Sequence, residues 1–389
     1  MRHCQSCQST DLDVIYELQA VPVHSCLLIE SRADALAFPR GDLKLAFCRS
    51  CGFISNLAFD DQVQSYSAKY EETQGFSPHF RQFTQRLATQ LIERHGLHDK
   101  RVLEIGCGKG EFLVSLCELG PNRGVGFDPG YIAERTSSAA ASRIEFVKDF
   151  YSEKYAHVAA DFVCCRHTLE HIHRVREFIA MVAQAIASRP DTVVFFELPD
   201  VLRILQELAF WDVYYEHCSY FSTGSLARLF RSCGFDILRI AREYDDQYIT
   251  IEARLGRAQA KPLPDEQDLE PLRRAAEHFQ HHVARKIGEL RQGVQAFSAK
   301  QRKVVLWGSG SKAVAYLTTM GIEREIEYVV DINPYKHGVY MAGTGQQIVA
   351  PEFLKQYQPD VVIAMNPIYK DEIQRDLDRL GVRAELMAV

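Results

Sequence analysis

Residues 101–113, RVLEIGCGKGEFL, decide the fold of the central part of this 389-residue chain. The stretch opens with the apolar residues of a short buried strand, Val102, Leu103 and Ile105. Every second position then carries a glycine, at Gly106, Gly108 and Gly110. Glycine has no Cβ atom, so the backbone can turn tightly there and pass close to a ligand. With a helix expected from Glu111, the stretch predicts a strand, a ligand-binding turn and a helix of an α/β fold.

The spacing of these glycines favours a ligand other than a dinucleotide. A dinucleotide loop would need its third glycine at position 111, which is Glu. Glu104, inside the strand, is a poor neighbour for a pyrophosphate and suits a ligand with an amino group and a sulfonium charge. A second apolar strand ends on Asp128, where a carboxylate can accept both hydroxyls of a ribose. The alternative is a glycine-rich turn without a ligand, and the agreement of Glu104, the glycines and Asp128 speaks against it.

The pattern E-x-G-x-G-x-G with a later acidic strand end resembles class I S-adenosylmethionine (SAM) methyltransferases. The resemblance implies SAM as a cofactor and a sheet that is parallel except for a final antiparallel pair. We expect the adenine beside Asp149 and Phe150, which follow the third strand. The predicted cofactor-binding residues are Glu104, Gly106, Gly108, Gly110, Asp128, Asp149, Phe150 and His167.

The bulk properties restrict the class of protein. A composition of 47% hydrophobic and 25% charged residues is that of an ordinary globular protein, and the length suggests two or three domains. The net charge of −6 argues against nucleic-acid binding, which needs a basic face. The sequence shows neither a membrane-spanning apolar run nor a signal peptide, so we expect a cytoplasmic protein with a small-molecule substrate.

The N-terminal segment, residues 1–72, predicts a metal site. It contains two C-x-x-C pairs about 40 residues apart, Cys4 with Cys7 and Cys48 with Cys51. Four thiolates at this spacing indicate one tetrahedral zinc ion with a structural role, because they leave no open ligand position. Disulfides are the alternative, and they are disfavoured in a reducing compartment. The loop between the pairs is longer than a minimal zinc ribbon needs.

Residues 73–256 predict a methyltransferase domain of alternating helices and strands. A helix is expected over 78–95, followed by five strands and a closing hairpin. The strands are predicted at Val102–Ile105, Gly124–Asp128, Ile144–Val147, Asp161–Cys165, Val193–Glu197, Asp236–Ala241 and Tyr248–Leu255.

The remaining residues predict a connecting helix, over 257–301, and a smaller Rossmann-like domain, over 302–389. Strands are expected at Lys303–Trp307, Tyr328–Asp331 and Asp360–Ala364. Gly308, Gly310 and Lys312 stand where the first strand turns into a helix, and they could form an anion site for the substrate. A domain that only packs and binds no ligand is an equal alternative from the pattern alone.

Two polar stretches follow strands of the methyltransferase domain and are expected at the cofactor rim. Tyr214, Glu216 and His217 supply a phenol, an acid and a base that titrates near neutral pH. His167 and His171 lie in a second His-rich turn, where a hydrogen-bonding role is favoured over a metal pair because no third ligand is evident. The alternative without a catalytic role is a polar loop whose histidine caps a backbone carbonyl.

The order of a four-cysteine segment, a SAM domain and a small Rossmann-like domain is similar to that of sugar C-methyltransferases. That family methylates nucleotide-linked 4-keto-deoxyhexoses at the carbon beside the ketone. Its Y-x-E-H motif maps onto Tyr214, Glu216 and His217, with the histidine as base, and its other site residues onto His171 and Tyr70. Its C-terminal motif D-x-N-P-x-K-x-G maps onto 331–338.

Three stretches depart from the family pattern: Arg166 with His167, residues 71–75, and Met365 before Asn366. They put the sugar in question but not the zinc or the SAM. The sequence therefore predicts a SAM-dependent C-methyltransferase in which His217 removes a proton, Glu216 orients it, and Tyr70, Tyr214 or His171 stabilises an enolate. An O- or N-methyltransferase on the same scaffold is the alternative, and a SAM-binding module without activity is a third reading.

Overall fold

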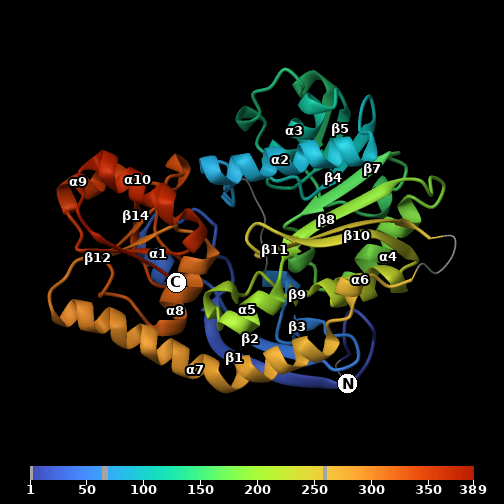
Figure 1. The fold of residues 1–389 in the computed structure, drawn as a ribbon. Helices are drawn as coiled ribbons and strands as arrows, with labels where there is room; N and C mark the ends of the chain where they lie inside the picture. The colour runs from blue at the N-terminus through green and yellow to red at the C-terminus, as the bar shows by residue number, and fades with distance from the viewer. Residues whose placement is uncertain (1–2, 64–68, 257–260) are drawn as a thin grey trace.

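The computed structural model describes residues 3–63, 69–256 and 261–389. Three sheets organise them, and a long helix runs beneath two of the sheets along one edge of the molecule (Figure 1). The predicted boundary at residue 257 lies outside the described residues. In the part of the chain that is described, no helix is both long and apolar enough to cross a membrane.

The central sheet has seven strands in the order β10-β11-β8-β7-β4-β5-β6, and β11 alone runs opposite to the other six strands. The predicted parallel sheet with a closing antiparallel pair is confirmed. Its strands are β4 (Arg101–Ile105), β5 (Arg123–Phe127), β6 (Ile144–Val147), β7 (Phe162–Arg166), β8 (Val193–Pro199), β10 (Phe235–Glu243) and β11 (Tyr248–Leu255). Its helices are α2 (Pro78–His95), α3 (Glu111–Leu119), α4 (Val175–Ala185), α5 (Val201–Glu207) and α6 (Thr223–Ser232).

Helix α2 begins and ends where its sequence dictates. Ser77 caps the first turn by accepting a hydrogen bond from the Phe80 N–H at 3.2 Å, and Pro78 sets the first helical residue. Gly96 ends the helix with a left-handed φ of 58°. The apolar face between these ends packs on the sheet and so fixes the segment that leads into the glycine turn.

The N-terminal segment forms a four-stranded antiparallel sheet rather than an isolated zinc ribbon. Its elements are β1 (Leu12–Pro22), α1 (Arg32–Leu36), β2 (Arg40–Cys48), β3 (Ile54–Asn56) and β9 (Ser219–Tyr220). The long β1–β2 pair accounts for the extra residues between the cysteine pairs. Strand β9 comes from the methyltransferase part of the chain and pairs with β3, so the two parts share one sheet.

The C-terminal sheet has five parallel strands in the order β14-β13-β12-β15-β16, reached through α7 (Leu269–Ala299). Its strands are β12 (Val304–Trp307), β13 (Tyr328–Val330), β14 (Gln347–Val349), β15 (Val361–Ala364) and β16 (Glu385–Ala388). Its helices are α8 (Ser311–Met320), α9 (Leu354–Tyr357) and α10 (Lys370–Leu380). The sequence predicted three of these strands and missed β14 and β16.

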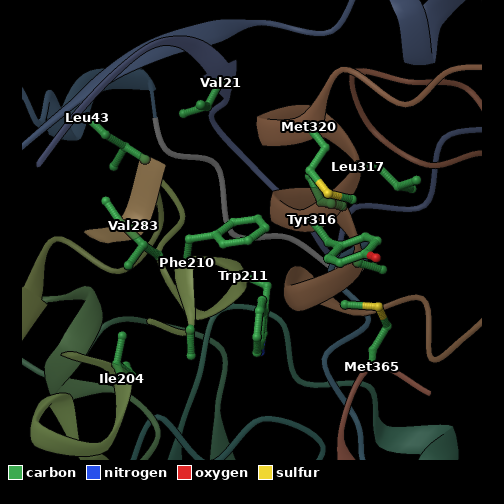
Figure 2. Packing of buried hydrophobic residues seen from close by; sticks show 14 of the residues in the cluster. Val21, Leu43, Ile204, Phe210, Trp211, Val283, Tyr316, Leu317, Met320 and Met365 are labelled. Carbon is green, nitrogen blue, oxygen red and sulfur yellow. The ribbon is translucent and has the colours of Figure 1, made fainter. Parts of the chain in front are cut away.

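One hydrophobic core joins the N-terminal sheet, α5, α7 and the C-terminal unit (Figure 2). Val21 and Leu43 of the N-terminal sheet belong to the same cluster as Tyr316 of α8. The Phe210 ring, from the segment after α5, stacks against Tyr316 with centroids 6.1 Å apart and an interplanar angle of 8°. The placement of the C-terminal unit is therefore fixed by burial of apolar surface rather than by a linker alone.

Candidate active site

The glycine turn after β4 needs residues without side chains. Gly106, Gly108 and Gly110 have φ angles of 68°, 53° and 84°, a region that other residues seldom adopt. A Cβ on Gly106 would lie 2.0 Å from Thr168 Oγ1, and one on Gly110 would lie 2.6 Å from the Phe146 ring. The three glycines therefore allow the turn to form and to pack closely against Thr168 and Phe146.

Asp128 lies at the end of β5 against this turn. Its Oδ2 accepts a hydrogen bond from Gly108 N at 2.9 Å and its Oδ1 one from Gly130 N at 2.7 Å. Burial raises the pKa of Asp128 above its usual value. The carboxylate shapes the turn and still has lone pairs that could accept further hydrogen bonds.

Glu104 is a buried acid on the cofactor side of the cavity. Only 2% of the residue is exposed, its Oε2 has no hydrogen-bond partner, and burial raises its pKa to about 8. A buried oxygen without a partner is costly unless a ligand supplies a donor. An amino group would supply that donor and a positive charge would stabilise the carboxylate, and SAM carries an amino group and a sulfonium.

Asp149 and Phe150 lie at the rim of the same cavity. Phe150 is 59% exposed, and its backbone N–H donates to Asp149 Oδ1 at 2.8 Å. Asp149 Oδ2 accepts the Tyr155 hydroxyl at 2.7 Å and also pairs with Lys154. The exposed ring leaves a flat surface at the rim, and an adenine beside it stays a prediction.

His167 belongs to a buried ion cluster rather than standing alone at the rim. Its Nε2 lies 2.9 Å from Glu197 Oε1 and its Nδ1 3.7 Å from Glu170 Oε1. Burial opposes the charged imidazole, yet these carboxylates raise the pKa of His167 to about 9. Arg166 also donates to Glu197, at 2.9 and 3.3 Å. The cluster lines the cavity, so His167 would act on a cofactor as a cation.

His217 is buried beside a phenol and a second imidazole. Its Nε2 lies 2.8 Å from the Tyr214 hydroxyl, and the rings of His171 and His217 meet edge to face at 4.9 Å. Burial, followed by the positive field of His171, His167 and Lys312, holds the pKa of His217 well below its usual value. The imidazole is therefore neutral at pH 7 and can accept a proton.

Glu216 does not orient His217, which corrects the prediction from the sequence. The carboxylate points to the N-terminal segment: Oε1 lies 3.0 Å from His24 Nδ1, and Oε2 accepts from Ser25 N at 2.7 Å. Burial opposes ionisation, but the hydrogen bond from His24 leaves the pKa of Glu216 below its usual value. The Tyr214 hydroxyl, rather than Glu216, lies within hydrogen-bond distance of the His217 ring. His24 carries no local sequence signal and was missed.

Tyr70 lines the cavity from the segment before α2. Lys109 of the glycine turn holds it there by donating to Tyr70 O at 2.9 Å and to Gly130 O at 3.0 Å. The Tyr70 ring lies 6.1 Å from the ring of His24. The backbone of the predicted acceptor-side residue is thus tied to the cofactor turn.

The C-terminal unit faces the cavity with the turn after β12. Gly308 and Gly310 line it, and α8 begins there at Ser311. Lys312 lines it too, but its Nζ lies 2.6 Å from Asp212 Oδ1, so its charge already has a partner.

Lys336, from the D-x-N-P-x-K motif, is the second cation on this side and was not predicted as a site residue. It is 6% exposed and lies 4.0 Å from Asp331 Oδ2. The rest of that motif docks the two units, because Asn333 Nδ2 donates to Glu71 Oε1 at 2.8 Å and Arg135 pairs with the same carboxylate.

One cavity of about 1100 Å³ lies between the central and C-terminal sheets, and most of the predicted site residues line it, but Gly110 and Glu216 do not. A single small-molecule pocket measures about 300–1,000 Å³. The cavity is therefore large enough for a cofactor and a second molecule, with His217 among the residues that line it.

The four predicted metal-ligating cysteines converge at the far side of the N-terminal sheet. Cys4 Sγ lies 3.6 Å from Cys51 Sγ, and Cys7 Sγ lies 3.6 Å from Cys48 Sγ. A disulfide would require about 2.05 Å. Two sulfurs on one tetrahedral zinc lie about 3.8 Å apart, given bonds of about 2.3 Å. The geometry fits a metal ion and not disulfides.

Comparison with known proteins agrees with this arrangement. Residues 79–240 match the model of a methyltransferase domain, and residues 262–384 match that of a C-methyltransferase C-terminal domain. The C-methyltransferase NovU of Streptomyces niveus is 26% identical over 391 residues, which cover 95% of this chain and 90% of NovU. A ubiquinone biosynthesis O-methyltransferase of Salmonella paratyphi A is 28% identical over 141 residues, which cover 35% of this chain and 57% of that protein.

Among solved structures, magnesium protoporphyrin IX methyltransferase from Synechocystis, with bound S-adenosylhomocysteine, is 19% identical and covers 46% of this chain and 84% of its own. Its TM-score of 0.36 is too low to support a functional argument. The two domain matches and the site define the chain as a SAM-dependent methyltransferase. With its C-methyltransferase C-terminal domain and a relative of that activity along its length, it is a SAM-dependent C-methyltransferase.

Proposed function

We propose that this chain methylates the carbon beside a ketone in a nucleotide-linked keto-deoxy sugar. The observation that carries the proposal is the buried, neutral imidazole of His217, 2.8 Å from the Tyr214 hydroxyl, in the cavity that the glycine turn also lines. Carbon methylation needs a base for a C–H proton, whereas a cofactor-binding module needs none. A neutral histidine is the usual side chain for that task.

In this proposal each residue of the cavity has one task. His217 accepts the proton from the carbon beside the ketone, and the Tyr214 hydroxyl holds the imidazole in position. Tyr70 and His171 donate hydrogen bonds to the enolate oxygen, where negative charge develops. SAM would supply an electrophilic methyl group, and its loss to the enolate carbon would leave neutral S-adenosylhomocysteine. Glu104 would hold the positively charged end of SAM and Asp128 its ribose.

The nucleotide part of the substrate would lie against the C-terminal unit. A diphosphate needs positive charge, and the start of α8 at Gly310 offers backbone N–H groups together with the helix dipole. Lys336 is the cation that adds to them, since its nearest carboxylate oxygen, Asp331 Oδ2, is 4.0 Å away, whereas Asp212 holds Lys312 at 2.6 Å. The cavity volume of about 1100 Å³ supports two bound molecules.

We also propose one structural zinc ion on Cys4, Cys7, Cys48 and Cys51. Three of the four residues are buried, and the thiolates leave no open position for a substrate. The ion would join the start of the chain to the end of β2, and so stabilise the sheet that carries β9.

Isotope exchange at the acceptor carbon tests the proposed chemistry. Nucleotide-linked 4-keto-deoxy sugars are incubated with the enzyme in D₂O, with and without SAM, and the products are analysed by mass spectrometry and NMR. We expect deuterium at the carbon beside the ketone and, with SAM, a new carbon-bound methyl group. His217→Asn should abolish the exchange while SAM still binds. A methyl group on oxygen or nitrogen would refute carbon methylation and support the alternative O- or N-methyltransferase.

A further inference from the structure

Glu170, His171 and His217 form a second cluster of possible metal ligands, inside the active-site cavity. One ligand atom from each lies within 4.8 Å of those of the other two. Glu170 is 2% exposed, and neither of its carboxylate oxygens has a hydrogen-bond partner. Its nearest cation is His167, whose Nδ1 lies 3.7 Å from Oε1. Burying a carboxylate without a hydrogen bond costs free energy, so a positively charged ligand would stabilise Glu170.

The backbone around the cluster holds its two segments together. Cys218 Sγ donates to Glu170 O at 3.7 Å, and Ser219 Oγ donates to Ile172 O at 2.7 Å. Strand β9, which begins at Ser219, is fixed in turn by its pairing with β3. The turn that carries Glu170 and His171 is therefore fixed against the segment that carries His217, and side-chain rotation alone brings the three ligand atoms together.

Two imidazoles and one carboxylate are the ligands of zinc sites that have three protein ligands and a fourth position open to water or substrate. Imidazole selects Zn²⁺, Co²⁺ or Ni²⁺ over Mg²⁺ and Ca²⁺, which prefer oxygen. Ligands on one tetrahedral ion lie about 3.4 Å apart when the bonds are about 2.1 Å. The ligand atoms lie within 4.8 Å of one another, so each distance between them must shorten by about 1.4 Å or less when the ion binds.

We propose that Glu170, His171 and His217 bind a divalent transition-metal ion of the zinc type, which inhibits the enzyme. The bound ion takes a lone pair of the His217 imidazole, and the base can then no longer accept a proton. This inhibition rests on the proposed function of His217, whereas the binding of the ion does not. The site is distinct from the four-cysteine cluster, because it consists of nitrogen and oxygen ligands and opens into the cavity.

Cobalt binding tests the site separately from activity. Protein whose cysteine site is filled with zinc is titrated with Co²⁺, and bound cobalt is measured by equilibrium dialysis and by its visible absorption. The wild type should bind one cobalt ion without the thiolate charge-transfer band. Glu170→Gln and His171→Asn should each weaken binding by more than about 100-fold, since even residues outside the ligand sphere cost 10–100-fold.

The exposed helix α7 offers a matched control. His278 and His282 stack at 4.5 Å on its surface and could also hold a metal ion. The double variant His278→Asn/His282→Asn should bind cobalt as the wild type does. The proposal is overturned if the wild type binds no cobalt, or if binding is lost in this double variant and kept in Glu170→Gln. Thermal unfolding of each variant shows whether a loss reflects misfolding, and His171→Asn provides the second route if Glu170→Gln unfolds.

Turnover in the presence of Zn²⁺ separates the site from the proposed function. Zinc should inhibit the wild type at the concentration that fills the second site, and a chelator that spares the cysteine site should restore turnover. If the ion binds with the expected dependence on Glu170 and turnover continues, the metal site stands and His217 is not the base. If no ion binds and His217→Asn still abolishes deuterium exchange at the acceptor carbon, the metal site is refuted and the role of His217 as base is supported.

Discussion

The substitution Asp128→Asn changes the cofactor site by one charge and keeps the size of the side chain. A carboxylate offers about four lone-pair positions. Two of them accept Gly108 N at 2.9 Å and Gly130 N at 2.7 Å, which leaves about two for the hydroxyls of a ribose. Asn keeps one oxygen, so at least one hydrogen bond to an ionised acceptor is lost.

A hydrogen bond to a charged group contributes about 1.5–3 kcal/mol, so the SAM dissociation constant should rise about 10- to 150-fold. Calorimetric titration with SAM and with S-adenosylhomocysteine measures the change. Asp161→Asn is the matched control, because Asp161 Oδ2 also accepts a backbone N–H, from Arg101 at 2.9 Å, at the opposite end of β4. We expect no change in the control. An Asp128→Asn protein that binds SAM within about threefold of the wild type would refute the placement of the ribose.

Four further predictions concern the rest of the cavity and the metal. The pKa of His217 lies well below 6.5, so the imidazole stays neutral as the pH falls to that value. Turnover should therefore decrease only below pH 6.5. A decrease with a midpoint at pH 7 would contradict a buried base. Glu216→Ala removes the carboxylate that contacts Ser25 N–H and the His24 ring, and denaturant unfolding should show a free energy of unfolding lower by about 3–5 kcal/mol. A decrease below about 1 kcal/mol would show that the pair is unimportant for stability. Lys336→Met should raise KM for a nucleotide sugar more than Lys312→Met does, and equal effects would argue against the assignment. Elemental analysis should find one zinc per chain, and its retention in Cys48→Ser would exclude the four-cysteine site.

The sequence predicts best where the determinants are local. The glycine spacing, the apolar strand before it and the caps of α2 all lie within a few residues of what they control, and the corresponding elements form as expected. Strands β14 and β16 were missed because they are the two edge strands of their sheet and lack the continuous apolar run of the central strands: β14 has two buried apolar residues, and β16 is mostly exposed.

Contacts between distant segments could not be predicted. Glu216 contacts His24, which is 192 positions away in the sequence. Its sequence neighbour His217 was therefore the plausible partner before the fold was known. Lys312 meets Asp212 in the same way, across 100 positions. The metal pair that the sequence suggested, His167 with His171, does not form; Glu170 and His171 of that turn instead lie close to His217, which precedes strand β9.

The two-residue strand Ser219–Tyr220 limits how this chain can be recombined with its relatives. Ile54 pairs with Tyr220 and Ser55 with Ser219, so the edge of the N-terminal sheet is completed by residues two and three positions after His217. A hybrid enzyme made by a single crossover near residue 72 would join a β3 from one parent to a β9 from the other. Exchanging residues 1–72 together with 214–222 keeps both sides of this ladder, and the His24–Glu216 pair, from one parent. Hybrids with altered acceptor preference should therefore be built with two crossover segments that travel together.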